Sequence, residues 1–348
     1  MASQLGNKGY STDIENYHML ISKVKVNSAN VLSISAFISI GVALRIYDIG
    51  ISNVISLNYS RVDIKDSVGL LSIVSNYIMI ASIPLYFLLP LIRPFGNKYY
   101  YFTLSVSILS IVVTFFVLRT RSIVIASVIS FVFGWVYTYL YAKKGGVTKI
   151  PLFMIVRIVV ILLIIVVSSS VMRVARGIME VGVGNLSILS SIENSLVSGD
   201  MNYGKDIDEI MGVFEQQRLS LNGQSYYRVL FIPIPRTIWP DKPENTQQVV
   251  ADIMGKNYAN FTLPPGIQGD AFINFGFWGV GIFIFYAIIA SYLDKRSDPY
   301  SLIFLSSSFL PLFHLSRGAF TNPIIMMIII AISTKVLSFI YFRGKRFG

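Results

Sequence analysis

Long runs of apolar residues, each about twenty residues long, divide this chain at short polar gaps. A helix needs about 20 residues to cross a hydrocarbon core of about 30 Å. Because lipid offers the backbone no hydrogen-bond partners, spanning segments are helices or closed barrels, and the short alternating segments of a barrel are not evident. The sequence therefore predicts an all-α fold, a polytopic bundle of membrane-spanning helices.

We identify eight candidate spans from these runs. They are Asn30–Ile46, Val68–Ile92, Tyr99–Leu118, Ser122–Tyr141, Ile150–Met172, Ala271–Tyr292, Pro299–Ser316 and Thr321–Phe342. The seventh gives the weakest signal, because it is short and carries three serines, Pro311 and His314. No internal repeat is visible. We treat residues 1–348 as a single membrane domain.

The loops between the spans carry most of the charge. The chain is 54% hydrophobic and 14% charged, with a net charge of +11. A basic chain can bind nucleic acid, but loop lysines and arginines are what the positive-inside rule expects, so we expect no nucleic-acid partner. The absence of cysteine excludes disulfides and thiolate chemistry.

Lysines concentrate in one alternating set of loops, which the positive-inside rule assigns to the cytoplasm. This set holds Lys23, Lys25, Arg93, Lys98, Lys143, Lys144, Lys149, Lys295, Arg296, Arg343, Lys345 and Arg346. With eight spans, both termini lie on this side, including the polar segment 1–28. The long segment 173–270 lies on the opposite side, where we expect it to form a cap over the bundle.

The basic residues of the opposite face are mostly arginine. They include Arg45, Arg61, Arg119, Arg121, Arg173, Arg176, Arg218, Arg228, Arg236 and Arg317. A guanidinium group presents a planar fork of donors that suits bidentate phosphate binding, and it does not deprotonate. A single arginine can equally extend to lipid headgroups. Several arginines at span ends favour an anion site.

Within the cap, the stretch RVLFIPIPRTIWPDKPENTQ (Arg228–Gln247) stands out. Its prolines exclude a regular helix and fix φ, so we expect a stiff, extended loop that presents Arg236, Trp239, Asp241 and Lys242 in set directions. Trp239 has two readings that the sequence leaves open. It can anchor the loop at the headgroup level, or it can stack on a sugar ring.

Two further polar residues lie at span ends. Asp270, at the start of the sixth span, can be a partner of the helix dipole or a general base. His314, at the end of the seventh, can cap a helix end or act chemically, since intramembrane polar groups are often functional. The chain has only two histidines and shows no metal-ligand spacing, so we expect no metal.

The order of these motifs resembles that of the O-antigen and capsule repeat-unit polymerases of the Wzy type. The segments that carry the resemblance are the R-T-R-S turn at Arg119–Ser122, the P-x-P-R-x-x-W-P-x-K-P segment at Pro233–Pro243, the P-P-G-x-x-G-D-x-x-x-N-F-G segment at Pro264–Gly276 and the R-G turn at Arg317–Gly318. They cover about the last two thirds of the chain. The front departs from the family, whose members often have ten or more spans.

The resemblance implies glycosyl transfer on the periplasmic face of a bacterial inner membrane, with oligosaccharide units on undecaprenyl pyrophosphate as substrates. The fold would resemble that of membrane-embedded polyprenyl-dependent glycosyltransferases. Under this hypothesis Arg119, Arg121, Arg173, Arg236 and Arg317 hold the pyrophosphate, Asp270 or His314 accepts the proton, and Trp239 and Asp241 contact sugar. No cofactor is expected, and a chain-length regulator is left open as a partner.

Two rival functions remain open on the sequence. An O-antigen ligase uses the same donor lipid but transfers the glycan to a lipid A core. A polysaccharide transporter or flippase would place charges at mid-span along a path, whereas the spans here contain mainly serines, with Arg157 and Lys335 near cytoplasmic ends.

Overall fold

We describe the protein from a computed structural model. It describes residues 28–56, 70–92, 98–118, 121–142, 151–160, 203–231, 243–244, 246–255, 263–294 and 299–341, together with the single positions 163, 234 and 239. All the regular secondary structure in this part of the chain is helical. The predicted all-α class is therefore confirmed.

Within the described residues, six helical segments are long and apolar enough to cross a membrane. They are Val31–Ile49, Leu71–Ile92, Lys98–Phe116, Ser122–Tyr139, Gly266–Ile288 and Thr321–Ile340. Each matches one of the predicted spans. The predicted fifth span, Ile150–Met172, lies largely outside the described residues, which include only a helix over 152–160 and position 163. The total of eight spans stays a prediction.

The predicted seventh span differs from one continuous helix. It consists of two nine-residue helices, α15 (Pro299–Ser307) and α16 (Phe309–Arg317). At the break, the backbone N–H of Ser308 donates to the carbonyl of Leu305 at 3.2 Å, and its hydroxyl donates to the carbonyl of Phe304 at 2.6 Å. Pro311 has no N–H to continue the helical ladder. The serines and proline that weakened the sequence signal are thus the residues at and around the break.

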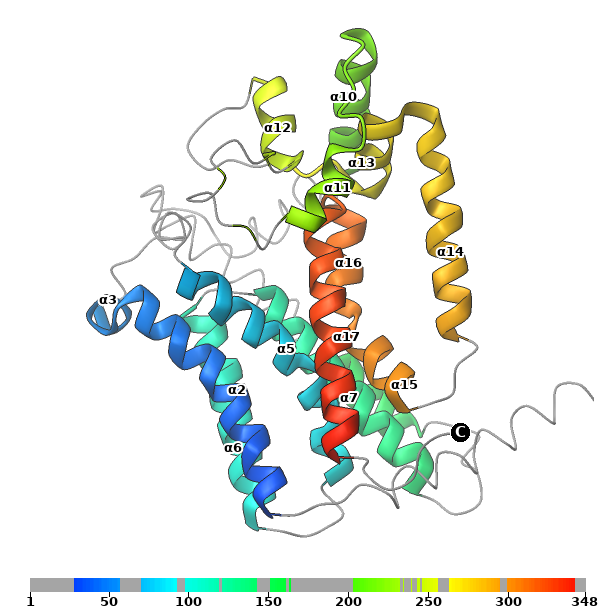
Figure 1. Ribbon diagram of the computed structural model, residues 1–348. Coiled ribbons are helices and arrows are strands. Elements are labelled where there is room, and N and C mark those ends of the chain that lie inside the picture. The colour runs from blue at the N-terminus through cyan, green and yellow to red at the C-terminus, as the bar shows by residue number, and fades with distance from the viewer. Residues whose placement is uncertain are drawn as a thin grey trace, which may run out of the picture. The chain divides into compact units, whose positions relative to one another are not determined.

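The chain forms two compact units (Figure 1). The first unit comprises residues 1–166, 293–309 and 329–348, and the second comprises 167–292 and 310–328. Helices of the first unit are α2 (Ser28–Ile49), α3 (Ile51–Ser56), α5 (Leu70–Ile92), α6 (Lys98–Phe116), α7 (Arg121–Ala142) and α15, with the later part of α17 (Thr321–Tyr341). The prediction of a single membrane domain stays a prediction.

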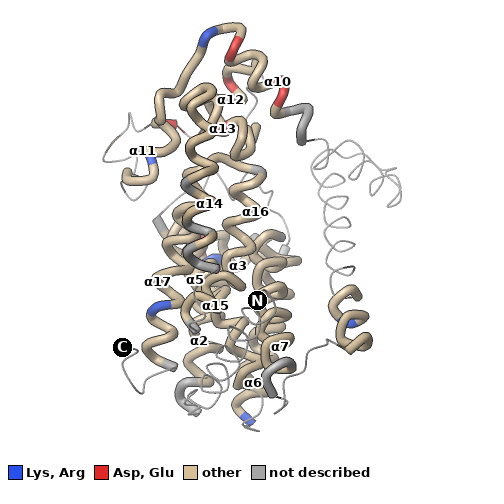
Figure 2. Tube along the Cα trace, turned by 90° about the vertical axis from the view of Figure 1, so that its right-hand side faces the viewer, with Lys and Arg blue, Asp and Glu red and all other residues tan. Residues whose placement is uncertain are grey.

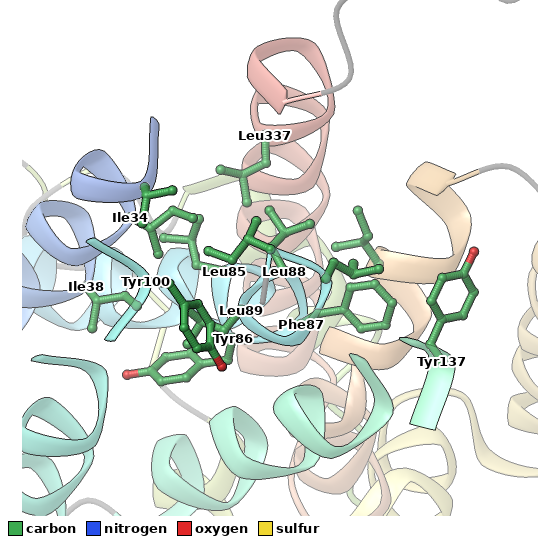
Figure 3. Packing of buried hydrophobic residues seen from close by; sticks show 14 residues of the cluster. Ile34, Ile38, Leu85, Tyr86, Phe87, Leu88, Leu89, Tyr100, Tyr137 and Leu337 are labelled. Atoms are coloured by element: carbon green, nitrogen blue, oxygen red, sulfur yellow. The ribbon is translucent and has the colours of Figure 1, made fainter. Parts of the chain in front are cut away.

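Helix α5 is the centre of the first unit. Its run from Leu85 to Ile92 is almost entirely buried, and side chains from α2, α6, α7, α15 and α17 pack around it (Figure 3). Two glycines allow this close packing. A Cβ atom at position 134 would collide with the carbonyl oxygen of Phe87, and one at position 41 would lie 2.9 Å from Met79. Small residues at such contacts are typical of membrane helix pairs.

Helix α6 shows the opposite burial pattern to that of a helix in a water-soluble protein. Its buried residues are Tyr100 and four hydroxyl residues: Thr103, Ser107, Ser110 and Thr114. Large apolar side chains, among them Phe102, Ile108, Leu109 and Phe116, lie exposed on the other side. Polar groups inside and apolar groups outside minimise free energy only in an apolar solvent, so this pattern supports a lipid environment.

The second unit combines short amphipathic helices with apolar ones. Helices α10 (Tyr203–Gln216), α12 (Thr246–Ile253) and α13 (Gly266–Phe275) share a small core of Ile210, Phe214, Val250, Ala251, Leu263 and Ile273. The 3-10 turn η2 (Gly276–Gly279) joins α13 to α14 (Val280–Asp294). Figure 2 shows that acidic residues gather at α10, whereas few charged residues lie along the long helices.

Candidate functional site

Asp270 lies at the centre of the second unit. It is 0% exposed, although it is ionisable. One carboxylate oxygen, Oδ1, accepts hydrogen bonds from Ser225 Oγ at 2.8 Å and from Asn274 Nδ2 at 3.3 Å. The other, Oδ2, accepts from the backbone N–H of Phe320 at 3.1 Å. A buried carboxylate costs several kcal/mol unless such donors replace water, and here three do so.

Ser225 and Asn274 complete a network with Asp270. Ser225 lies on α11 (Gln224–Phe231), and Asn274 lies one turn after Asp270 on the same face of α13. Asn274 Nδ2 also donates to Ser225 Oγ at 2.6 Å and to the Asp270 carbonyl at 2.7 Å. We call these three residues the Asp270 network. It joins α11 to α13 through side chains that are all buried.

The turn between α16 and α17 is fixed against this network. Besides the Phe320 bond to Asp270, Thr321 Oγ1 donates to the carbonyl of Ser225 at 2.8 Å. Gly318 N–H donates to the carbonyl of His314 at 2.7 Å, which closes the end of α16. A Cβ atom at position 318 would lie 2.8 Å from that carbonyl oxygen and 3.0 Å from Nε2 of Gln247. The R-G turn therefore requires glycine at this position.

Aromatic rings cover one side of the network. The ring of Tyr226 stacks on Phe320 with a centroid distance of 4.3 Å and lies 5.0 Å from Phe275. The ring of Tyr286, on α14, lies 6.2 Å from Phe320. Burial raises the pKa of Tyr226 well above its ordinary value, and the nearby Asp270 and Tyr286 act in the same direction. The Tyr226 hydroxyl is therefore protonated at any physiological pH.

The bonding of Asp270 bears on its two predicted roles. It is the fifth residue of α13 and not in the first turn, so a helix-dipole interaction does not account for it. Its oxygens are occupied by three donors and have no exposed surface. Accepting a proton from a substrate hydroxyl would require these bonds to open. The geometry favours a positioning role, and the role of general base stays a prediction.

His314 and Trp239 are also described. His314 lies half-buried on α16, one turn before the R-G turn, with its ring 5.8 Å from that of Phe313. Trp239 is half-buried, and its ring packs edge-on against Phe231, the last residue of α11, at 5.3 Å. This contact ties the proline-rich segment to α11. Whether a sugar stacks on Trp239 stays a prediction.

The predicted arginine cradle lies largely outside the described residues. Arg121 begins α7 in the first unit and Arg317 ends α16 in the second, but neither side chain is described. Arg119, Arg173, Arg236 and Asp241 are outside the described residues altogether. Of the other arginines predicted on this face, Arg45 pairs with Asp48 at 2.6 Å and with the hydroxyl of Ser72. The pairing of Arg45 is a structural role in the first unit.

Sequence reasoning singled out Asp270 but not most of its partners. Ser225 sits in the ordinary stretch QSYYRVLF, and no local signal marks it as a hydrogen-bond donor to a residue 45 positions later. Asn274 had a usable signal, because an Asp and an Asn four residues apart on a helix share one face. Phe320 acts through its backbone N–H, which no side-chain pattern can indicate.

Searches against protein-family models, curated proteins and solved structures gave no match to this chain. The functional argument therefore depends on the residues and their geometry. Among the described residues, no three His, Asp or Glu side chains gather as metal ligands would.

Proposed function

We propose that this protein is a membrane-embedded glycosyltransferase that polymerises lipid-linked oligosaccharide repeat units on the outer face of a bacterial inner membrane. One observation carries the proposal. Two of the four segments that resemble the repeat-unit polymerases, the P-P-G segment and the R-G turn, meet in the second unit. Asp270, from the P-P-G segment, bonds to Phe320 beside the R-G turn, and Gln247, which follows the proline-rich segment, lies against Gly318 of that turn.

The reaction we assign is a displacement at an anomeric carbon. A sugar hydroxyl of the incoming lipid-linked unit attacks the anomeric carbon of the growing chain. The new glycosidic bond forms as the bond from that carbon to the undecaprenyl pyrophosphate breaks, and the pyrophosphate oxygen takes the electron pair. Because this leaving group is already good, positioning and stabilisation of its charge supply most of the rate.

In this proposal Arg119, Arg121, Arg173, Arg236 and Arg317 bind the departing pyrophosphate. The Asp270 network positions the turn that carries Arg317. His314 accepts the proton of the attacking hydroxyl, since it is half-buried one turn before Arg317 and an imidazole nitrogen can accept a proton. Trp239 and Asp241 contact the sugar.

The test uses purified protein in proteoliposomes with a lipid-linked repeat unit as the only substrate. We expect a ladder of products, each longer by one unit, together with released undecaprenyl pyrophosphate. Arg317→Ala abolishes the ladder, because loss of a guanidinium at a diphosphate removes charge stabilisation worth about 100-fold or more in rate. Arg218→Asn is the matched control. Arg218 is exposed at the turn after α10 with φ of 52°, a conformation that asparagine tolerates.

The same assay separates the rival functions. A ligase forms no ladder but transfers the glycan once when a lipid A core acceptor is added. A transporter leaves the lipid-linked unit chemically unchanged and moves it across the bilayer. In a strain without the gene, a single repeat unit on the lipopolysaccharide indicates a lost polymerase, and a bare core indicates a lost ligase. A full-length ladder made by the Arg317→Ala protein would contradict the assignment of that residue.

A further inference from the structure

The most exposed aromatic side chains described lie at one corner of the second unit. Phe277 is 80% exposed and Trp278 is 90% exposed, and both belong to η2, the turn between α13 and α14. Gly276, with φ of 56°, ends α13, and a Cβ atom at position 279 would lie 2.6 Å from the carbonyl oxygen of Ala271. Gly276 permits the positive φ that ends α13, and Gly279 permits close approach of the backbone to Ala271. The chain therefore turns here, and α13 and α14 do not continue as one helix.

The two helices at this corner have different surroundings. In α13 most residues are buried, and its polar side chains Asp270 and Asn274 are satisfied within the network. In α14 the exposed residues from Val280 to Ile288 are glycine or apolar, and Val280, Ile284 and Ile288 are each exposed by 60% or more. An apolar exposed surface that continues along a helix matches a lipid solvent, and the exposed rings of η2 extend the same surface.

The helix lengths indicate where a span begins. Four residues of 3-10 helix and fifteen of α-helix rise about 30 Å together, which equals the thickness of a hydrocarbon core. The whole segment from Gly266 to Asp294, if straight, would rise about 43 Å and exceed it. Lys295 and Arg296 follow at the far end, where basic residues flank a span.

We infer that η2 marks the membrane boundary: Phe277 and Trp278 lie among phospholipid headgroups, α14 crosses the bilayer, and α13 with the Asp270 network lies on the aqueous side. An indole ring has an apolar body and one N–H donor, which suits the headgroup region. This moves the predicted start of the sixth span from Ala271 to about Gly276. It assigns the headgroup anchor to Trp278, whereas Trp239 packs against Phe231. The inference does not depend on the proposed enzymatic function.

Fluorescence quenching by depth tests the inference. The chain has three tryptophans, so a protein with Trp135→Phe and Trp239→Phe retains only Trp278. It is reconstituted into phosphatidylcholine and phosphatidylglycerol vesicles that carry a nitroxide in the headgroup, near the top of the acyl chain or near the chain end. We expect the strongest quenching from the two shallow probes and the weakest from the deep probe.

A matched variant moves the fluorophore along the same helix. Adding Trp278→Phe and Ile284→Trp to this background places the single indole six residues further along, about 9 Å deeper. We expect the deep nitroxide to quench this protein most strongly. Strongest quenching of Trp278 by the deep probe, or quenching by aqueous iodide with none from any lipid probe, would overturn the inference.

Cysteine labelling supplies a second measurement, because the chain has no cysteine of its own. Maleimide reacts with the thiolate, which forms in water and not in hydrocarbon. In membrane sheets open on both faces, Gln268→Cys on the exposed side of α13 should react about tenfold or more faster than Ile284→Cys. Equal, slow labelling of both positions places α13 in the hydrocarbon and refutes the boundary at η2. Open sheets make the result independent of which face is outside.

Discussion

The two units bury polar groups in different ways. In the first unit, hydroxyl groups mostly donate singly to backbone carbonyls, within their own helix as from Ser107 to Thr103, or to a neighbouring helix as from Thr103 to Val31 at 3.0 Å and from Ser333 to Ala81 at 2.5 Å. In the second unit, a carboxylate, a hydroxyl and an amide satisfy one another and a backbone N–H. A hydroxyl can be buried with one acceptor nearby, whereas a carboxylate needs a full set of donors.

This difference predicts different responses to mutation. Isolated hydrogen bonds contribute independently, so their losses add. Members of a connected network depend on one another, so removing one leaves the others buried without partners. The first unit should therefore be sensitive mainly to the volume of its residues, and the second to any single change in its polar set.

Gly134→Ala should have the largest effect. The added methyl group collides with the carbonyl oxygen of Phe87, and a backbone atom cannot move aside as a side chain can, so α7 must separate from α5. We expect a loss of about 3 kcal/mol or more in the free energy of unfolding, measured by SDS titration in mixed micelles. Gly212→Ala is the control, because a Cβ atom there meets nothing within 4 Å. An unchanged transition for Gly134→Ala would show that α5 and α7 do not pack this closely.

Asp270→Ala should rank second. It removes the acceptor for Ser225 Oγ and for the Phe320 N–H at once, whereas Asn274 Nδ2 keeps its bonds to Ser225 Oγ and to the backbone carbonyl of residue 270. Leaving buried donors unsatisfied should cost about 3 kcal/mol, measured in the same titration. Asp270→Asn should recover little of this loss, because its NH₂ group would face donors. Full stability of both variants would contradict the network.

A double-mutant cycle on Ser225→Ala and Asn274→Ala tests most directly whether polar groups in the second unit are energetically coupled and those in the first unit are not. Each single change should cost about 1 to 2 kcal/mol, and the double change clearly less than the sum, since both act on one network. The comparison cycle in the first unit uses Thr103→Val and Ser333→Ala, whose hydrogen bonds share no partner. That pair should be additive within about 0.5 kcal/mol. Additivity in both cycles would remove the distinction between the units.

Thr103→Val should have the smallest effect. It keeps the shape of the side chain and removes one interhelical hydrogen bond to the carbonyl of Val31. Such bonds in membrane bundles contribute about 0.6 kcal/mol on average, so the unfolding transition should shift only slightly. A loss above about 2 kcal/mol would indicate that α6 hydroxyls act as a coupled set. Ser316→Ala is the control, because Ser316 is exposed and bonds within its own helix.

Much of the first unit could be predicted from the sequence. The predicted spans Val68–Ile92 and Ser122–Tyr141 lie within two residues of α5 and α7 at both ends. The sequence predicts these boundaries because apolar runs stop at charged residues, and placing a charge in hydrocarbon costs free energy. The burial of the α6 hydroxyl groups was harder to predict from the sequence, since it depends on which neighbouring helices pack around α6.

The second unit could be predicted only in part. Hydropathy extends the sixth span back to Gly266, because α13 contains enough apolar residues to resemble membrane helix. It does not register the positive φ of Gly276 or the lack of space at Gly279, which turn the chain at η2. Asp270 was recognisable as unusual from its position in the sequence. Its partners were not, since Ser225 and Phe320 lie 45 and 50 positions away.

Those separations affect biosynthesis. A ribosome makes the chain from its amino terminus, so Ser225 emerges first, Asp270 follows and the Phe320 amide comes near the end. The aspartate cannot acquire all its donors until the nascent chain has been extended to Phe320, after the whole of α14 has been synthesised. Closure of the Asp270 network is therefore a late event, and a prematurely truncated polypeptide retains an acidic side chain without its last hydrogen-bond donor.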